Sequence, residues 1–123
     1  MPKVTDKTTE FIATSNFVDV FQFLNLGERA NVSEIGDGAR KICALTWKEL
    51  KQYDKKQEEQ HDEHTLKQMC FRSLFVYHIL AEGWGFGDDY TLNAVDVING
   101  QKLGWALGCM LYEINTRKYW YLF

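Results

Sequence analysis

The sequence predicts a helix-rich α/β domain, and three observations favour this class. Apolar residues in several segments recur at steps of three and four, the spacing of one face of an α-helix. Two short stretches, 10–14 and 90–98, are rich in the β-branched and aromatic residues that are typical of strands. The 123 residues, 46% of them apolar and 25% charged, suffice for one domain, or part of one, with a packed core.

The pattern of charge and hydropathy excludes two classes of protein. The formal net charge is −3 with both signs interspersed, which leaves no basic face, so we expect no nucleic-acid partner. Apolar stretches such as 74–77 are far shorter than the roughly 20 residues that cross a membrane. Residues 1–6 carry charge but no apolar run, so we expect neither a targeting signal nor a transmembrane segment in this chain.

The first half of the chain is expected to form short elements. A polar N-terminal extension, 1–9, precedes the strand at 10–14. A helix of about three turns follows, capped by Ser15 and ended near Gly27. Apolar residues at helical spacing then predict one continuous helix from 34 to 50.

The tripeptide Asn31-Val32-Ser33, just before this second helix, has two interpretations. It is an N-glycosylation sequon, which makes Asn31 a glycosylation candidate. Ser33 is also a suitable N-cap for the helix, in which case the segment serves only as a cap. The residues alone leave both interpretations open.

A run of mixed charge, 48–67, is typical of an exposed helix surface and a linker between two packed segments. The helix after it is expected to begin near Asp62 or Thr65. Its apolar surface is wider than one stripe, which indicates neighbours on several sides. We expect it to end at Gly83, acting as a left-handed cap.

The C-terminal third is expected to contain a loop, a strand and a helix. The glycine-rich segment 83–89 predicts the loop, and 90–98 the strand, which ends in the turn dipeptide Asn99-Gly100. The residues from 103 to 114 form the most regular amphipathic pattern in the chain. The apolar tail 119–123 is expected to need a partner surface.

Several motifs suggest chemistry, but none of them predicts an active site. His61 and His64 are three residues apart and lack the spacing of a His-Glu-x-x-His zinc motif, so we favour an exposed polar turn and expect no metal site. The glycines of 83–87 lack the spacing of a phosphate-binding loop. Asp88 and Asp89 are adjacent, and adjacent side chains in extended backbone face opposite ways, so they do not form an acid/base pair.

The three cysteines are Cys43, Cys70 and Cys109. Cys43 and Cys70 lie on the apolar faces of two predicted helices that a polar segment joins. Antiparallel packing of these helices allows either a disulfide or two buried thiols. Cys109, next to the apolar stripe of the last helix, would then be the cysteine left outside the pair.

Four segments, taken together and in order, resemble the C-terminal portion of the apyrase (nucleoside triphosphate diphosphohydrolase) family. They correspond to that family's Cys-x-x-x-Trp, Tyr-Cys-Phe, Gly-aromatic-x-Phe and Trp-x-Leu-Gly elements. In this chain they read Cys43-Ala44-Leu45-Thr46-Trp47, Met69-Cys70-Phe71, Gly83-Trp84-Gly85-Phe86 and Trp105-Ala106-Leu107-Gly108. The stretch Phe11-Ile12-Ala13 also resembles the family, and the four elements in order make the resemblance fairly specific.

The resemblance implies an actin-like fold of two RNase H-type α/β lobes, of which only the C-terminal part is present. Residues 10–92 would form the helical part of the second lobe. Residues 93–123 would supply the strand and the helix with Trp105, Leu107 and Gly108 that return to the first lobe. The missing N-terminal lobe is then the expected partner of this chain.

The resemblance also implies a function. Members hydrolyse the terminal phosphates of nucleoside di- and triphosphates of the GDP, UDP or ATP type, with Ca²⁺ or Mg²⁺, in the Golgi or ER lumen, anchored to the membrane, or outside the cell. The family also pairs the two cysteines that match Cys43 and Cys70, so the resemblance favours the disulfide over the thiols.

The family's catalytic parts are not in this sequence. It has no phosphate loop of the Asp-x-Gly-Ser-Ser or Asp-x-Gly-Gly type, and no match to the glutamate that activates water. We therefore expect a C-terminal segment of a nucleotide phosphatase that is inactive alone and holds no cofactor. The alternative is a self-contained helix-rich binding or regulatory module without catalysis.

The part of the family's site that could lie in this chain is the pocket that stacks the nucleobase between two aromatic rings. The matching positions are Met69 and Asn16, neither of which is aromatic. Met69 can still press its thioether against a ring, and Phe17 or Phe71 could compensate. We therefore take these four residues as the candidate base pocket.

Overall fold

The computed structural model describes residues 8–116, and these form a mixed α/β structure in which helices predominate. The strands are β1 (Ile12–Ala13), β2 (Arg29–Asn31), β3 (Thr91–Ala94), β4 (Val97–Ile98) and β5 (Gln101–Lys102). The helices are α1 (Asn16–Phe23), α2 (Val32–Ala44), α3 (Trp47–Lys55), α4 (Glu63–His78), the π-helical turn η1 (Ile79–Gly83) and α5 (Trp105–Thr116). The predicted helix-rich α/β class is thus confirmed.

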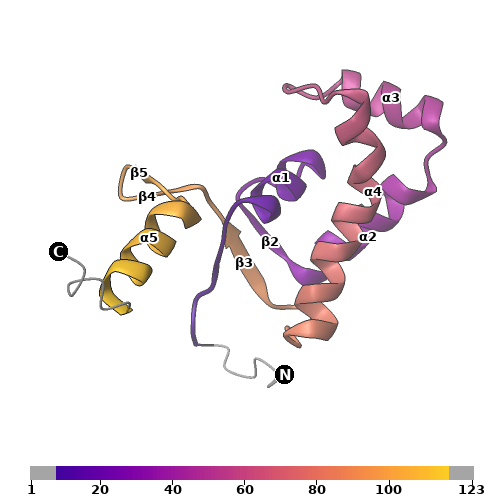
Figure 1. The fold of residues 1–123 in the computed structure, drawn as a ribbon. Helices are drawn as coiled ribbons and strands as arrows, with labels where there is room; N and C mark the ends of the chain where they lie inside the picture. Colours follow the sequence, from indigo (N-terminus) through magenta and orange to yellow (C-terminus); the bar gives the residue numbers. More distant parts are fainter. Residues whose placement is uncertain (1–7, 117–123) are drawn as a thin grey trace.

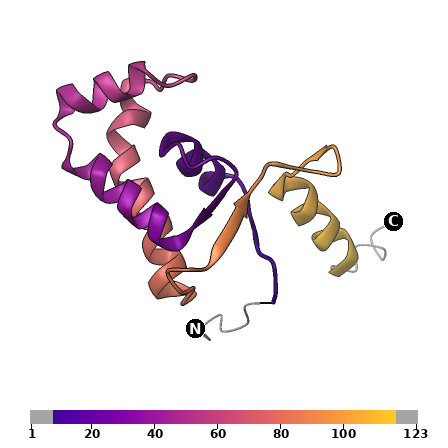
Figure 2. The same cartoon turned by 180° about the vertical axis from the view of Figure 1, so that it is seen from behind.

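The sheet that organises the molecule has the strand order β1-β3-β2, with β1 parallel and β2 antiparallel to β3. Helices α2 and α4 lie side by side, and α1 packs against α4 and β3. The two-stranded sheet of β4 and β5 leads to α5, which lies on the opposite side of β3 from α2, α3 and α4 (Figures 1 and 2).

The core lies between the three-stranded sheet and helices α1, α2 and α4. The core residues come from every element from β1 to η1 and from β3, because each of these helices and strands presents its apolar face inward. The largest fully buried side chains are those of Phe21, Phe23, Ile35, Met69, Leu80, Leu92, Val20, Val32, Val76 and Ser73.

The N-terminal strand and helix form where the sequence predicts them, but both are shorter than expected. Strand β1 covers only two residues, and α1 has eight residues, or about two turns. Ser15 occupies the N-cap position, but its side chain makes no capping hydrogen bond. Its backbone N–H instead donates to Asp96 Oδ1 (3.1 Å). The left-handed residues Asn25 and Gly27 turn the chain after the helix.

The expected helix over 34–50 is wrong in two respects. Its N-cap is Asn31 and not Ser33, because Asn31 forms a capping box with Glu34. The helix also breaks after Ala44, since Thr46 and Glu49 form a second capping box that starts α3. The periodicity runs through both helices because both bury their apolar faces against the same core.

Helix α4 is capped by Asp62, one of the two predicted starts. It passes into η1, which ends at Gly83, but the left-handed residue is Gly85 (φ 71°), so the predicted role of Gly83 is wrong. The predicted strand over 90–98 is interrupted at Val95 and Asp96, where the chain leaves β3 for the separate β4–β5 sheet. The turn at Asn99-Gly100 is confirmed, with positive φ at both residues.

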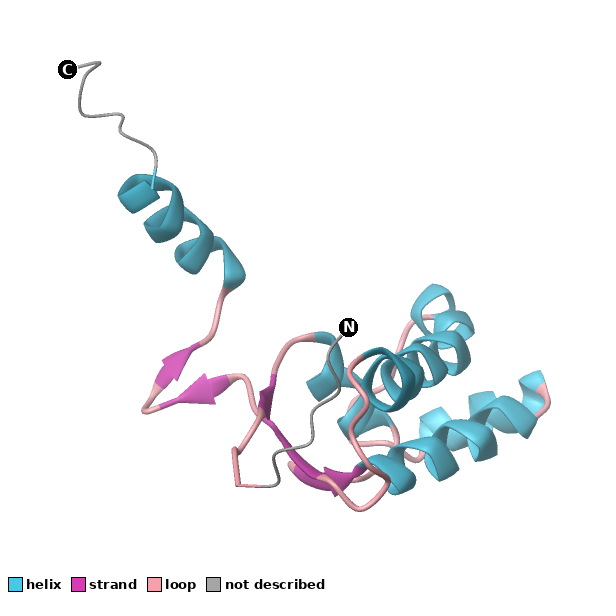
Figure 3. Cartoon of the chain, turned by 90° about the horizontal axis from the view of Figure 1, so that it is seen from below, coloured by secondary structure: helices cyan, strands magenta, loops and turns pink. Residues whose placement is uncertain are grey.

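Helix α5 is confirmed as a helix, but none of its residues is buried. Trp105 is 84% exposed, and Figure 3 shows the helix standing apart from the other four. The apolar tail 119–123 lies outside the described residues.

Candidate functional site

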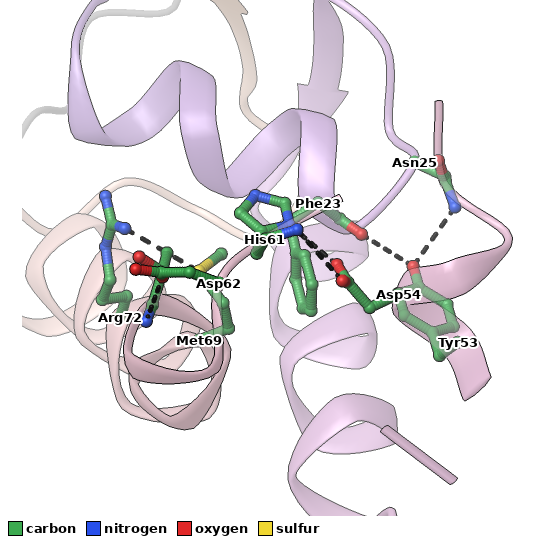
Figure 4. A network of polar contacts seen from close by, with 9 residues as sticks. Phe23, Asn25, Tyr53, Asp54, His61, Asp62, Met69 and Arg72 are labelled. Atoms are coloured by element: carbon green, nitrogen blue, oxygen red, sulfur yellow. Dashed lines mark hydrogen bonds and ion pairs between the residues drawn. The ribbon is translucent and has the colours of Figure 1, made fainter. Parts of the chain in front are cut away.

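A cleft of about 800 Å³ lies between α1, the end of α3, the segment that joins α3 to α4, and α4 itself. This size is within the range of small-molecule sites. Its walls carry more polar than apolar side chains: Asp19, Gln22, Phe23, Asn25, Gly27, Tyr53, Lys56, Gln57, Glu58, Glu59, His61, Thr65 and Arg72. Figure 4 shows its polar contacts, with Arg72 and Met69 at one end and Tyr53 and Asn25 at the other.

Arg72 connects α4 to the start of α1. Its Nε donates to Asn16 Oδ1 (2.8 Å) and its Nη2 to Asp19 Oδ2 (2.8 Å) and to Asn16. Its Nη1 lies 3.8 Å from Met69 Sδ. The side chain of Arg72 is only 24% exposed, so these partners hold the planar guanidinium in one orientation at the wall of the cleft.

Asp54 and His61 form a second polar group at the cleft. Asp54 is the buried acidic residue of α3, and its Oδ2 accepts the backbone N–H of His61 (3.0 Å). Its Oδ1 lies 2.8 Å from His61 Nδ1, and the ring of His61 packs edge-on against Phe23. Because both carboxylate oxygens hold His61, the imidazole is fixed in position and keeps Nε2 as its second polar atom.

Tyr53 closes the far end of the cleft. Its hydroxyl donates to the carbonyl of Phe23 (2.7 Å) and accepts from Asn25 Nδ2 (3.2 Å). Burial raises the pKa of Tyr53, because the phenolate is less well solvated there than in water, and hydrogen bonds from Gln57 and Asn25 oppose this only partly.

Carboxylates around the start of α4 have a lowered pKa. Hydrogen bonds from the side chain and backbone of Thr65 lower the pKa of Asp62, which caps the helix. A hydrogen bond from Lys67, together with its charge, lowers the pKa of Glu63. Both groups therefore stay ionised near the positive end of the helix dipole.

The structure brings together only part of the candidate base pocket. Asn16 and Met69 meet at Arg72, although the side chain of Met69 is completely buried. Phe17 stacks instead on Trp84, with ring centroids 6.3 Å apart. Phe71 is 72% exposed, stacks on Phe75, and does not line the cleft. The aromatic half of the pocket thus stays a prediction.

Arg72, which lines the cleft, and Asp54, which holds His61 at its wall, were not predicted. Asp54 lies four residues after the buried Leu50, so helical spacing could have placed it on the inner face of α3. No local signal identifies Arg72, because its partner Asn16 is 56 residues away in the sequence.

The two histidines of the rejected zinc motif have different partners. His61 contacts Asp54, whereas His64 Nε2 lies 3.0 Å from Gln68 Nε2. Within residues 8–116, no group of three or more His, Cys, Asp or Glu side chains is arranged to hold a metal ion. Asp88 belongs to the turn before β3, where its carbonyl accepts the backbone N–H of Ser33 (3.1 Å).

A disulfide joins Cys43 of α2 to Cys70 of α4, with the Cα atoms 5.0 Å apart. The pairing that the resemblance implied is therefore confirmed. Cys109 is a free, exposed thiol on α5, the helix that also carries Trp105, Leu107 and Gly108. In the described part of the chain, no helix is both long enough and apolar enough to cross a membrane.

Comparison with known proteins gives one consistent result. Residues 1–120 match the GDA1/CD39 (nucleoside phosphatase) family. Ectonucleoside triphosphate diphosphohydrolase 7 of Pongo abelii is 32% identical over 109 residues, which are 85% of this chain and 18% of that protein. Nucleoside-diphosphatase mig-23 of Caenorhabditis briggsae is 34% identical over 96 residues, 75% of this chain and 17% of that protein. Probable apyrase 6 of Arabidopsis thaliana is 29% identical over 107 residues, 86% of this chain and 19% of that protein. The chain thus spans less than a fifth of the length of these relatives.

Proposed function

The chain belongs to the GDA1/CD39 (nucleoside phosphatase) family, and from this premise we propose that it forms the C-terminal, substrate-side part of an enzyme that hydrolyses the terminal phosphate of nucleoside di- or triphosphates. The observation that carries the proposal is the match over residues 1–120 to a family of nucleoside phosphatases. The names of two relatives, an ectonucleoside triphosphate diphosphohydrolase and a nucleoside-diphosphatase, support the same substrate class.

The cleft is where we propose that the nucleoside part of such a substrate binds. Arg72 lines the cleft and presents a planar, fixed cation to it, while Asn16 and the buried Met69 contact this guanidinium from behind the wall. A guanidinium can both stack on a nucleobase and donate to its acceptor atoms. Phe17 and Phe71 would reach the ligand only after rearrangement of their present ring partners, Trp84 and Phe75.

The phosphate chemistry belongs, in this proposal, to another part of the enzyme. This sequence has no phosphate loop of the family type, and such loops supply the donors that stabilise charge on the transferred phosphate. Within residues 8–116, no three His, Cys, Asp or Glu side chains gather as they would around a metal ion, so we propose no Ca²⁺- or Mg²⁺-holding role for this part of the chain. An actin-like arrangement of two lobes, with residues 93–123 returning to the first, completes the proposal.

The disulfide supports a compartment where such bonds persist. Disulfides are common in secreted and ER-lumenal proteins and rare in the cytosol. We therefore propose that the protein works in the secretory pathway or outside the cell, as the name ectonucleoside triphosphate diphosphohydrolase says of one relative.

A first test assays the 123-residue chain alone with GDP, UDP and ATP in the presence of Ca²⁺ or Mg²⁺. We expect no phosphate release above buffer, because loss of transition-state donors costs several powers of ten in rate, on the order of 10³ for a single donor. Phosphate release that follows the chain through repeated purification would contradict the proposed division of roles.

A second test exchanges the matched segment of human ectonucleoside triphosphate diphosphohydrolase 7, a relative 31% identical over 109 residues, for this chain. We expect the chimera to hydrolyse a nucleoside triphosphate and the same protein lacking the segment to be inactive. Arg72→Ala in the chimera should raise KM, and Arg40→Ala serves as a matched control, because Arg40 is exposed and lies outside the cleft. A chimera that folds with its disulfide and is inactive would refute the proposal.

One observation favours the alternative, a binding module without catalysis. The body formed by β1 to η1 and β3 has its own buried core, to which α5 contributes no buried residue. In that case the cleft would bind nucleotide although the chimera remains inactive. The activity of the chimera separates the two candidates, and titration of the 123-residue chain with a nucleotide, followed by intrinsic fluorescence, tests the binding that both require.

A further inference from the structure

The function proposed above leaves one motif unused, the sequon Asn31-Val32-Ser33. It is the single Asn-x-Ser/Thr tripeptide in the 123 residues. Asn31 ends strand β2 and is also the N-cap of α2, so the sequon lies at a strand-to-helix junction. Because the cap is Asn31 and not Ser33, the candidate glycosylation site and the observed cap are the same side chain.

The two polar atoms of the Asn31 side chain have different roles. Its Oδ1 accepts the backbone N–H of Glu34 (2.9 Å) and the hydroxyl of Ser33 (2.9 Å). Its backbone N–H donates to Glu34 Oε2 (2.8 Å), which completes the capping box. Among the described residues, Nδ2 takes part in no hydrogen bond. Capping thus uses the oxygen of the amide and leaves the nitrogen available.

The backbone around Asn31 directs this side chain away from the core. Its neighbours Ala30 and Val32 are buried, whereas Asn31 is half-buried, as expected when successive side chains alternate across a strand. Strand β2 is the outer strand of the sheet order β1-β3-β2, so its other side carries no strand among the residues described. A large group on Asn31 Nδ2 would therefore extend away from the buried side chains of Ala30 and Val32, at the end of this outer strand.

We propose that Asn31 is N-glycosylated, with Oδ1 remaining the cap of α2 and Nδ2 carrying the glycan. In this reaction Asn31 Nδ2 forms a bond to the anomeric carbon of an oligosaccharide donated by a lipid diphosphate. The bond from that carbon to the phosphate oxygen breaks, its electron pair leaves with the lipid diphosphate, and Nδ2 releases one proton. The amide oxygen is unchanged, so the capping box persists in the product.

The glycan would have a physical consequence for the fold. An edge strand with free backbone groups can pair with another chain, and natural proteins cover such edges. A glycan on Asn31, the last residue of β2, would hinder the approach of another chain to this edge. The Cys43–Cys70 disulfide supports passage through the oxidising compartment in which this modification takes place.

The test expresses the chain with a secretion signal in a eukaryotic host and digests it with peptide-N-glycosidase in ¹⁸O-labelled water. We expect a gain in electrophoretic mobility after digestion and a labelled aspartate at position 31. Ser33→Ala and Asn31→Asp should each abolish the shift, because the first removes the sequon and the second removes the acceptor nitrogen. Ser33→Thr should keep the shift.

The variants also separate the glycan from the cap. Asn31→Asp retains an oxygen that accepts from Glu34, so we expect it to fold with its disulfide although it carries no glycan. A secreted, disulfide-bonded chain without a glycan would overturn the proposal. So would a glycan that persists in Ser33→Ala, because it would be attached elsewhere.

Discussion

At the scale of single residues, the Cys43–Cys70 bond joins the two helices that pack most closely together, α2 and α4. It closes a loop with a sequence separation of 27. The loop includes α3, which carries Asp54, and the following segment with His61, so the bond also restrains the wall of the cleft. Its main effect is to restrict the unfolded chain.

The double substitution Cys43→Ser and Cys70→Ser is therefore expected to lower the free energy of unfolding by about 3–4 kcal/mol, from the entropy of closing a loop of this length. Urea unfolding followed by circular dichroism measures the change. Cys109→Ser is the matched control and should have no effect, because Cys109 is exposed and free. Equal midpoints for the double variant and the native chain would contradict this account.

Tyr53 makes stability depend on pH in the alkaline range. Burial raises its pKa in the folded state above the ordinary value of 10.0. Below pH 10.0, Tyr53 is protonated in both the folded and the unfolded chain, so its contribution to the free energy of unfolding is complete in that range. As pH rises past 10.0, the unfolded state ionises first, and the contribution is lost as pH passes through the folded pKa.

We expect Tyr53→Phe to reduce the loss of stability between about pH 9 and pH 11, a range set around the ordinary tyrosine pKa. It also removes the hydrogen bond to the carbonyl of Phe23, so stability at neutral pH should fall by about 1 kcal/mol. Chemical unfolding at a series of pH values tests both effects. An unchanged alkaline slope in the variant would show that other groups cause the dependence.

At the scale of elements, the break between α2 and α3 depends on a local capping box. Thr46 Oγ1 accepts the backbone N–H of Glu49 (3.3 Å), and Glu49 Oε2 accepts that of Thr46 (2.7 Å). These hydrogen bonds lower the pKa of Glu49 in the folded state below its ordinary value of 4.5. They therefore stabilise the folded state above pH 4.5, and this stabilisation is lost as pH falls through the pKa of Glu49 in the folded state. The start of α3 is therefore expected to loosen in acid.

Thr46→Ala should lower the free energy of unfolding by about 1 kcal/mol, whereas Thr46→Ser should be nearly neutral because serine caps equally well. Thermal unfolding at neutral pH and near pH 4 compares them, and the difference between the two variants should shrink in acid. If Ala and Ser behave alike at neutral pH, the cap does not determine where α3 begins.

At the scale of the whole molecule, the chain consists of a packed body and one helix outside it. Seven large apolar side chains near or on α5 are exposed: Leu103, Trp105, Leu107, Met110, Leu111, Tyr112 and Ile114. A helix without tertiary contacts has little stability of its own in water. We therefore expect α5 to be the least stable helix of the described part of the chain.

Hydrogen exchange is expected to show weak protection over 103–114 and strong protection over 66–80, since local opening costs least where few contacts are buried. Trp47 is the reference for fluorescence, because it is half-buried and packs against the core, with the ammonium groups of Lys51 and Lys67 near its ring. Acrylamide should quench Trp105 more strongly than Trp47 in single-tryptophan variants. Equal protection of the two helices would favour the self-contained module.

The sequence by itself determined which segments become helices, the turn at Asn99-Gly100, the chain's family and, through the family resemblance, the disulfide partners. Helical periodicity and turn residues act over a few positions, so they can be interpreted without knowing the fold. The start of α4 at Asp62 was one of two predicted possibilities and shows the usual uncertainty of element ends.

Only the tertiary structure decided the rest, because the deciding contacts join residues that are distant in the sequence. Strand β2 has no β-branched run and exists because Arg29 and Ala30 pair with Asn93 and Leu92 of β3. Arg72 becomes part of the cleft through a residue 56 positions away. The exposed face of α5 has the same apolar pattern as a buried helix, since periodicity shows that a helix has an apolar face but not what covers it.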